Sequence, residues 1–202
     1  LLFQGDSITD AGRRQTDTPE LGCGYPHYVA GLIREQYPDT EWDFINLGIS
    51  GDRTKDLLSR WQEDCINLQP GILSILIGIN DTWRAFDSND PTTAGQFEAN
   101  YRKLLEDVRK NTNAKIIIME PFLLHDAPNK DDWRDDLNRK IDATRRLARE
   151  FADVYIPLDG MFAAASIEKQ PSYWAGDGVH PSEAGARFIA EAYVKALAKI
   201  LK

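Results

Sequence analysis

The sequence predicts an α/β protein in which a parallel sheet of five strands lies between two layers of helices. Short apolar segments alternate along the chain with amphipathic helical segments, which is typical of a doubly wound sandwich. Residues 71–78 have no polar face apart from Ser74, as expected for a strand that helices cover on both sides. The 202 residues contain no repeat and no interdomain linker, so we expect one domain over residues 1–202.

The expected strands are the five short apolar segments. Gly5 breaks the first of them, and the fourth is apolar on both faces like the third. In chain order they cover residues 1–4, 42–47, 71–78, 115–119 and 154–158. In such a sheet, ligands bind beyond the carboxyl ends of the strands. We therefore expect the functional residues in the loops that follow the strands.

Between the strands, apolar residues recur at three- and four-residue spacing, which indicates amphipathic helices. The first stripe follows Thr54, the expected N-cap of its helix, and the last follows Ser182. The four expected stripes are Leu57, Leu58, Trp61, Cys65 and Leu68; Phe97, Tyr101, Leu104, Leu105 and Val108; Trp133, Leu137, Ile141, Ala148 and Phe151; and Phe188, Ile189, Ala192, Tyr193, Ala196, Leu197, Ile200 and Leu201.

The composition narrows the range of partners and compartments. With 24 basic and 32 acidic residues the formal charge is −8, which gives no support for binding nucleic acid or an anionic membrane and favours neutral small molecules. No segment approaches the roughly 20 apolar residues of a membrane span. The only two cysteines, Cys23 and Cys65, and the lack of a signal peptide lead us to expect a cytoplasmic protein. Because the sequence begins directly on Leu1, a preceding segment is left open.

Two loops contain the residue types of a nucleophile and its base. Ser7 lies in the turn between the first strand and the next helix, where helix amides favour negative charge. A serine that only caps a turn would look the same, and Gly-Asp-Ser alone is a weak motif. Before the last helix, Asp177 and His180 are three residues apart. That spacing lets the carboxylate hold the imidazole in the tautomer whose other nitrogen accepts a serine proton.

Two further loops could supply hydrogen-bond donors to an oxyanion. After the second strand, Gly48 and Gly51 would let backbone amides approach a ligand closely, although a strand–helix turn also explains Gly48. After the all-apolar strand, the side-chain amide of Asn80 could point at a developing oxyanion. An Asx-turn or a helix cap explains Asn80 equally well. Each signal is modest, but the four occur in a fixed order in loops that follow strands.

In these four blocks the sequence resembles the GDSL, or SGNH, hydrolase superfamily, whose blocks carry Ser, Gly, Asn and His. The resemblance implies that Ser7 is the nucleophile and that His180 and Asp177 complete a catalytic triad. It places Gly51 and Asn80 in an oxyanion hole together with the amide of Ser7. It also implies a flavodoxin-like three-layer sandwich and serine esterase chemistry through an acyl-enzyme, which needs neither a metal nor a cofactor. Members of this superfamily often assemble, so a homo-oligomer is left open.

Outside the four blocks, the sequence is similar to carbohydrate acetylesterases that act on acetylated xylo-oligosaccharides. The matching segments are residues 48–51, 56–57, 60–61, 63–64, 78–81, 83–84, 179–182 and 184–185. Gln4 departs from the apolar residue often found before Gly5, and we attach no function to it. The resemblance therefore predicts an esterase that removes acetyl groups from small esters, acetylated sugars in particular.

Four side chains flank the catalytic loops and are candidates for contact with the substrate. Trp83 and Trp174 offer flat faces for sugar rings, unless each simply packs its loop against the sheet. Arg53 and Arg84 could bind substrate hydroxyls or carboxylates, but pairing with nearby acids is the more common arrangement.

Alternative functions have less support in the sequence. A thioesterase or lysophospholipase of the same superfamily is the competing enzyme, but no long apolar insertion is present to form an acyl groove. A carbohydrate-binding module without activity would not need every triad position. The acidic residues within 126–136 could suggest a cation site, but the start of a solvated helix explains them better. His125 follows the fourth strand and could line the pocket, whereas His27 fits a structural position.

Overall fold

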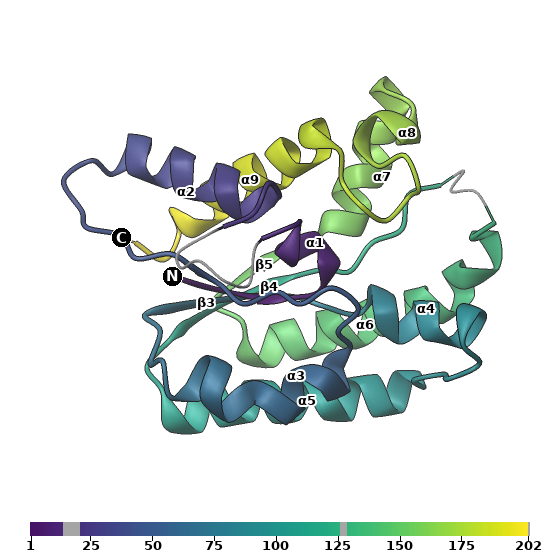
Figure 1. Cartoon of the computed structure of the whole chain (residues 1–202), viewed down its shortest axis with the longest axis horizontal. Helices are drawn as coiled ribbons and strands as arrows, with labels where there is room; N and C mark the ends of the chain where they lie inside the picture. Colours follow the sequence, from purple (N-terminus) through teal and green to yellow (C-terminus); the bar gives the residue numbers. More distant parts are fainter. Residues whose placement is uncertain (14–20, 126–128, 202) are drawn as a thin grey trace.

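The computed structural model describes residues 1–13, 21–125 and 129–201, and it has the three layers that the sequence predicts (Figure 1). All strand pairs in its sheet are parallel, in the order β2-β1-β3-β4-β5, which is the order of flavodoxin-like folds. The strands are β1 (Leu2–Gly5), β2 (Ile45–Asn46), β3 (Ile72–Leu76), β4 (Lys115–Met119) and β5 (Val154–Ile156). The expected α/β class with a five-stranded parallel sheet is therefore confirmed.

Helices cover both faces of this sheet, as Figure 1 shows. One face carries α1 (Ser7–Asp10), α2 (Tyr25–Gln36), α7 (Leu158–Glu168), α8 (Pro171–Trp174) and α9 (Glu183–Leu197), and the other carries α3 (Thr54–Trp61), α5 (Ala94–Asn111) and α6 (Arg134–Phe151). The core accordingly forms two buried clusters, one mainly beneath α2 and α9 and one mainly beneath α3 and α5. Helix α4 (Ile79–Asp87) follows β3 at the edge of the sheet where the strands end.

Two of the expected strands are longer in the sequence analysis than in the structure. The segment 42–47 pairs with β1 only at Ile45 and Asn46. Its first residues form aromatic contacts instead, since Trp42 stacks on Phe44 with ring centroids 6.0 Å apart and also meets Tyr37 just after α2. The last strand ends at Ile156 because the next residue is a proline, after which α7 begins. Both differences lie at strand ends and leave the sheet order unchanged.

The helix predictions need three corrections. The N-cap of α3 is Arg53, because Thr54 is already helical and donates its hydroxyl to Asp81 at 2.7 Å. A π-helical turn over Gln62–Ile66 follows α3 and shifts the apolar stripe, which leaves Leu68 42% exposed. The last stripe ends early, since α9 stops at Leu197 and Leu201 is exposed. The stripes of α5 and α6 are confirmed, as their members are all buried.

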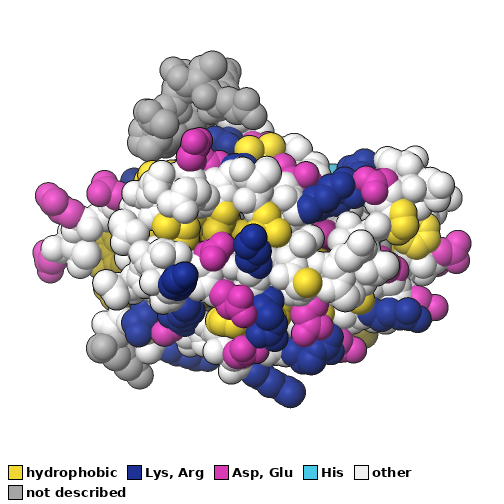
Figure 2. Space-filling view, turned by 90° about the horizontal axis from the view of Figure 1, so that it is seen from below, with side chains coloured by type: hydrophobic (Ala, Val, Ile, Leu, Met, Phe, Trp, Pro, Cys, Tyr) yellow, Lys and Arg dark blue, Asp and Glu magenta, His cyan; other side chains and the backbone are white. Residues whose placement is uncertain are grey.

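The outer surface carries charges of both signs. Figure 2 shows lysine and arginine side chains interspersed with aspartate and glutamate over the face that holds α3, α5 and α6. Ion pairs such as Arg102–Glu150 and Arg146–Glu98 link α5 to α6 on this face. In the described part of the chain, no helix combines the length and the apolar character that crossing a bilayer requires.

Candidate active site

Ser7 is the first residue of α1, directly beyond the carboxyl end of β1. Asp6 caps this short helix, because its side chain accepts a hydrogen bond from the amide of Ile8 at 3.0 Å. The Ser7 hydroxyl lines a cavity of about 190 Å³ between α1, the start of α2 and the residues before α9. His180 also lines the cavity, and its other walls include Ile8, Ala11, Pro181 and Ala186, so the lining is largely apolar. The fold therefore places Ser7 at a strand-to-helix turn, beside a small cavity.

Ser7, His180 and Asp177 form one continuous chain of hydrogen bonds. The hydroxyl oxygen of Ser7 lies 2.9 Å from Nε2 of His180, and Nδ1 of His180 lies 2.7 Å from Oδ2 of Asp177. The other oxygen of Asp177 accepts the amides of Val179 at 3.0 Å and His180 at 2.8 Å. One carboxylate thus orients the ring and also shapes the turn that carries it. This is the arrangement that a nucleophile, its base and an orienting acid require.

The surroundings of Asp177 and His180 favour an ionised Asp177 carboxylate and a more basic His180 imidazole. Partial burial opposes ionisation of Asp177, but hydrogen bonds from His180 and from two amides outweigh it, so its pKa lies well below the ordinary value. The hydrogen bond to Asp177 raises the pKa of His180, against the effect of partial burial and the positive charge of Lys130. His180 is therefore a stronger base than a free imidazole and is suited to remove a serine proton.

Gly51 lies in the loop between β2 and α3, residues 47–53, which we call the glycine loop. Gly51 has a φ of 91°, a conformation that favours glycine, and it leaves the backbone open to a ligand. Gly48 has a different reason to be glycine, because a Cβ there would lie 2.5 Å from the amide nitrogen of Asp10. The close packing of the loop on α1 thus explains Gly48, whereas a turn that needs a positive φ, the explanation expected from the sequence, applies to Gly51 and not to Gly48.

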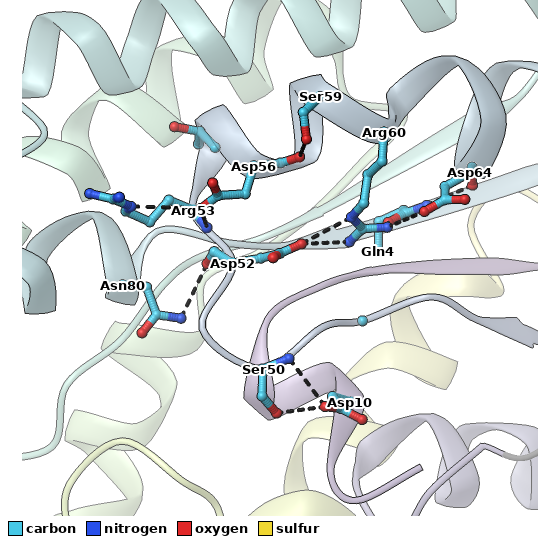
Figure 3. A network of polar contacts seen from close by, with 12 residues as sticks. Gln4, Asp10, Ser50, Asp52, Arg53, Asp56, Ser59, Arg60, Asp64 and Asn80 are labelled. Atoms are coloured by element: carbon cyan, nitrogen blue, oxygen red, sulfur yellow. Dashed lines mark hydrogen bonds and ion pairs between the residues drawn. The ribbon is translucent and has the colours of Figure 1, made fainter. Parts of the chain in front are cut away.

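Asn80 lies in the first turn of α4, and its side chain is tied to the glycine loop (Figure 3). Its amide nitrogen donates to the backbone carbonyl of Asp52 at 3.1 Å, and its oxygen accepts from Arg84 at 3.4 Å. A side-chain amide has two N–H groups, so one remains for a ligand after the bond to Asp52 is made. The structure thus connects Asn80 to the segment of Gly51, two positions that are distant in the sequence.

Of the four expected substrate contacts, Trp83 is the one that contacts the His180 ring. Its ring centroid is 5.9 Å from that of His180 and 5.0 Å from that of Trp133, which stacks on Phe86. Two aromatic side chains of α4 and Trp133, which directly precedes α6, thus form a wall next to His180. The sequence analysis assigned Trp133 to the core stripe only, and no local signal indicates its contact with Trp83.

The other three candidates make contacts inside the protein. Trp174 packs on Phe162 and Phe188. It also lines a cavity of about 500 Å³ with residues of α9, and the lining of that cavity does not include Ser7 or His180. Arg53 pairs with Asp90, its Nη2 lying 2.9 Å from Oδ2 of that residue. Arg84 pairs with Asp87 and reaches Asn80, as described above. Pairing with nearby acids, the more common arrangement, therefore holds for both arginines.

Lys130 is a residue of the site that sequence reasoning missed. Its ammonium donates to the backbone carbonyl of Asp177 at 2.9 Å and lies 5.5 Å from the ring centroids of both Trp83 and Trp133. It also lines a cavity of about 80 Å³ with His125, which is exposed. Lys130 is 47 residues away from Asp177 along the chain, so no spacing could have indicated it.

In the described residues, neither the acidic side chains near the start of α6 nor His27 is part of a metal site. Within residues 1–13, 21–125 and 129–201, no group of three His, Cys, Asp or Glu side chains is arranged to hold a metal ion. Asp126, part of the acidic run in the sequence, lies outside the described residues. Asp136 pairs with the buried Lys140 of the same helix. His27 is exposed and packs edge-on against Tyr28, with ring centroids 5.2 Å apart.

Comparisons with known proteins agree with this geometry. The GDSL-like Lipase/Acylhydrolase family matches residues 3–188. The acetylxylan esterase of Geobacillus stearothermophilus is 34% identical over 203 residues, covering 96% of this chain and 92% of that protein. Thioesterase 1/protease 1/lysophospholipase L1 of Escherichia coli (strain K12) is 27% identical, covering 98% of this chain and 82% of that protein.

Solved structures give the same result. The structure of the Geobacillus acetylxylan esterase matches with a TM-score of 0.89, covering 98% of this chain and 93% of that chain at 34% identity. A structure from Parabacteroides merdae, described as a GDSL-like lipase, has a TM-score of 0.94 at 33% identity and covers 98% of this chain and 94% of that one. The match over nearly the whole chain shows that this protein is a carboxylic ester hydrolase and belongs to the GDSL-like lipase/acylhydrolase family.

Proposed function

We propose that this esterase removes acetyl groups from acetylated sugars, xylo-oligosaccharides in particular, through an acyl-enzyme on Ser7. The observation that carries the proposal is the chain of hydrogen bonds from Ser7 through His180 to Asp177, beside a small, largely apolar cavity. Drug-sized ligands occupy pockets of roughly 300–1,000 Å³. A cavity of about 190 Å³ therefore favours a short acyl group over a long chain.

In the proposed reaction, the hydroxyl oxygen of Ser7 attacks the ester carbonyl while Nε2 of His180 accepts its proton. Asp177 keeps the imidazole oriented and stabilises its protonated form. The oxyanion accepts hydrogen bonds from the backbone amides of Ser7 and Gly51 and from the second N–H of the Asn80 side chain. The intermediate collapses to an acyl-enzyme, and the leaving alcohol takes the proton from His180. Water activated by His180 then releases the acid and frees Ser7.

The Geobacillus acetylxylan esterase supports both the triad and the substrate. Three of its solved structures are described as catalytic mutants, in which a serine, a histidine or an aspartate is replaced by alanine. The replaced aspartate precedes the replaced histidine by three residues, as Asp177 precedes His180 here. In the aromatic wall, the buried Trp133 supports Trp83 and Phe86, and Trp83 supplies a flat face next to His180, where a sugar leaving group would lie.

The competing proposal is a thioesterase or lysophospholipase, which the 27% identity to the Escherichia coli protein favours. The two proposals differ in the acyl chain that they require. Each methylene that enters an apolar groove adds about 0.8 kcal/mol of binding, so an enzyme for long chains gains activity with every carbon. An acetylesterase loses activity once the acyl group outgrows its slot.

A homo-oligomer and a cytoplasmic location stay predictions.

The test compares purified wild-type protein with Ser7→Ala on esters of one aryl alcohol from acetate to octanoate, and on acetylated xylo-oligosaccharides. We expect kcat/KM to be highest for acetate, to fall steeply by butyrate or hexanoate, and to require Ser7. We also expect Trp83→Ala to reduce activity on the oligosaccharides more than on aryl acetate, because only the larger substrate covers the indole. A profile that rises toward octanoate would overturn the sugar substrate and favour the competing enzyme.

A further inference from the structure

Arg60 of α3 is the centre of a partly buried polar network under the glycine loop (Figure 3). Its Nε donates to Oδ2 of Asp52 at 3.0 Å, and its Nη2 lies 2.9 Å from the same oxygen. Its Nη1 donates to the side-chain oxygen of Gln4 at 3.0 Å and to the carboxylate of Asp64 at 2.8 Å. One guanidinium thus connects strand β1, the glycine loop and the turn after α3.

Asp52 links Arg60 to the proposed oxyanion hole. Its side chain is held by Arg60, while its backbone carbonyl accepts the side-chain amide of Asn80 at 3.1 Å. Asp52 also follows Gly51 directly, so the position of Asp52 sets where the Gly51 backbone lies. A movement of the Asp52 side chain would therefore displace both groups that are proposed to contact the oxyanion.

Gln4 explains why Arg60 has a defined position. It lies in β1 with its side chain fully buried, three residues before Ser7. Its amide nitrogen donates to the backbone carbonyl of Asp64 at 2.7 Å, and its oxygen accepts from Arg60. Both ends of the side chain are thus engaged, as a buried amide requires. The departure from an apolar residue before Gly5, which had no function in the sequence analysis, provides an acceptor for Arg60.

We propose that Arg60 is a positioning residue that, held by Gln4, fixes Asp52 and thereby aligns the Gly51 amide and the Asn80 side chain as an oxyanion hole. This inference rests on the proposed function of Gly51 and Asn80. Arginine suits the task because its planar fork presents several donors at fixed angles, whereas lysine is a single flexible charge. The carboxylate of Asp52 is only 14% exposed, so water replaces the guanidinium poorly when Arg60 is removed.

The test measures kcat and KM for an aryl acetate in Arg60→Met, Asn80→Ala, the double variant and Ser7→Ala. We expect Arg60→Met to lower kcat by roughly 10- to 100-fold with little change in KM, because misplaced donors act on the transition state. We also expect the same substitution to cost much less in the Asn80→Ala background, because part of its effect acts through Asn80. Arg102→Met, which removes the surface pair with Glu150, is the matched control and should retain wild-type kcat.

Gln4→Met and Asp52→Asn extend the test to the two partners, and they replace Arg60→Met if that variant does not fold. Like Arg60→Met, each of these substitutions should lower kcat and leave KM nearly unchanged. Wild-type kcat in the folded variants, an effect confined to KM, or full additivity of Arg60→Met with Asn80→Ala would overturn the inference. Activity that persists in Ser7→Ala would instead overturn the proposed function, so the two failures are distinguishable.

Discussion

The glycine loop and the loop that carries the base are held in place in different ways. We call residues 175–182, between α8 and α9, the histidine loop. The glycine loop is tied to three other elements: Ser50 contacts Asp10 of α1 through its amide at 3.1 Å and its hydroxyl at 2.5 Å, Asp52 accepts from Asn80 of α4, and Asp52 contacts Arg60 of α3, the helix that follows the loop. Its shape is therefore a property of the assembled fold.

The histidine loop depends mostly on itself. Asp177 accepts three hydrogen bonds from Val179 and His180, and Ser182 caps α9 and donates its hydroxyl to the carbonyl of Tyr173 at 2.7 Å. Contacts from distant elements come from Ser7 to His180, from the amide of Leu124 to the carbonyl of Gly178, and from Lys130 to the carbonyl of Asp177. The comparison teaches that Asp177 and His180 form a local hydrogen-bonded pair, whereas the proposed oxyanion donors are positioned only when β1, α1, α3 and α4 have come together.

The largest expected effect tests the local unit. Asp177→Asn should lower kcat by roughly 10⁴-fold, because an amide does not hold the imidazole in the tautomer that accepts a proton. The folded structure should survive, since the asparagine oxygen can still accept the two amides. Steady-state kinetics with an aryl acetate, together with circular dichroism, measures both. A loss of less than tenfold would mean that the base does not depend on this carboxylate.

The next effect tests the oxyanion side. Asn80→Ala should lower kcat by roughly 10²–10³-fold with a smaller change in KM, because the amide acts mainly in the transition state. The same kinetic assay applies, with Arg102→Met as the surface control. If only KM rises, Asn80 positions the substrate and the glycine loop has another role.

A smaller effect concerns Asp6, which interacts electrostatically with His180 of the histidine loop and Asp52 of the glycine loop. Burial raises the pKa of Asp6 from its ordinary 3.8 to about 7, with His180 opposing and Asp81 and Asp52 adding to the rise. The folded protein thus keeps a proton that the unfolded chain releases, so Asp6 lowers stability as pH rises from about 4 to about 7. This contribution is at most about 1.4 kcal/mol per pH unit.

Asp6→Asn removes that proton and should flatten the dependence of stability on pH in this window. Chemical unfolding of wild type and variant at pH 5 and pH 8 measures the difference between their slopes. Carboxyls that do not interact with Asp6 titrate equally in both proteins and cancel in the comparison, whereas Asp81 and Asp52 respond to the loss of its charge. Parallel slopes would show that Asp6 does not bind this proton.

The smallest expected effect tests the contact of Lys130 with the histidine loop. The positive charge of Lys130 opposes protonation of His180, while the hydrogen bond that His180 donates to Asp177 and the charge of Asp6 favour it. Lys130→Met should therefore raise the pKa of His180, and the acid limb of kcat/KM should move to higher pH because the base becomes neutral later. Lys130→Arg keeps the charge and should leave the limb near that of wild type. A shift to lower pH would contradict the account.

The residues alone predicted what is local, the resemblance implied that Ser7 meets His180 and that Gly51 lies with Asn80, and contacts outside these motifs were missed. The strands and the Asp177–His180 pair were predictable because a few neighbouring residues determine them. Helices α7 and α8, which separate β5 from the histidine loop, were not predicted, since α7 buries only Leu158 and Phe162 and has little periodicity. Arg60 and Gln4 meet across 56 residues, and no spacing indicates such a pair.

The same limit applies to the substrate side. Of its four predicted residues, Trp83 contacts the base, whereas Trp174, Arg53 and Arg84 have partners inside the protein. An aromatic or basic residue near a catalytic motif has many potential partners, and the fold decides which one it meets.

The most direct test of the central claim is covalent labelling of the nucleophile. Wild-type protein, Ser7→Ala and His180→Ala are incubated with a fluorophosphonate, and intact mass spectrometry and peptide mapping follow the adduct. The account predicts one adduct per wild-type chain, located on Ser7, no adduct on Ser7→Ala, and greatly slowed labelling of His180→Ala. An adduct on another residue, or equal labelling of Ser7→Ala, would contradict it.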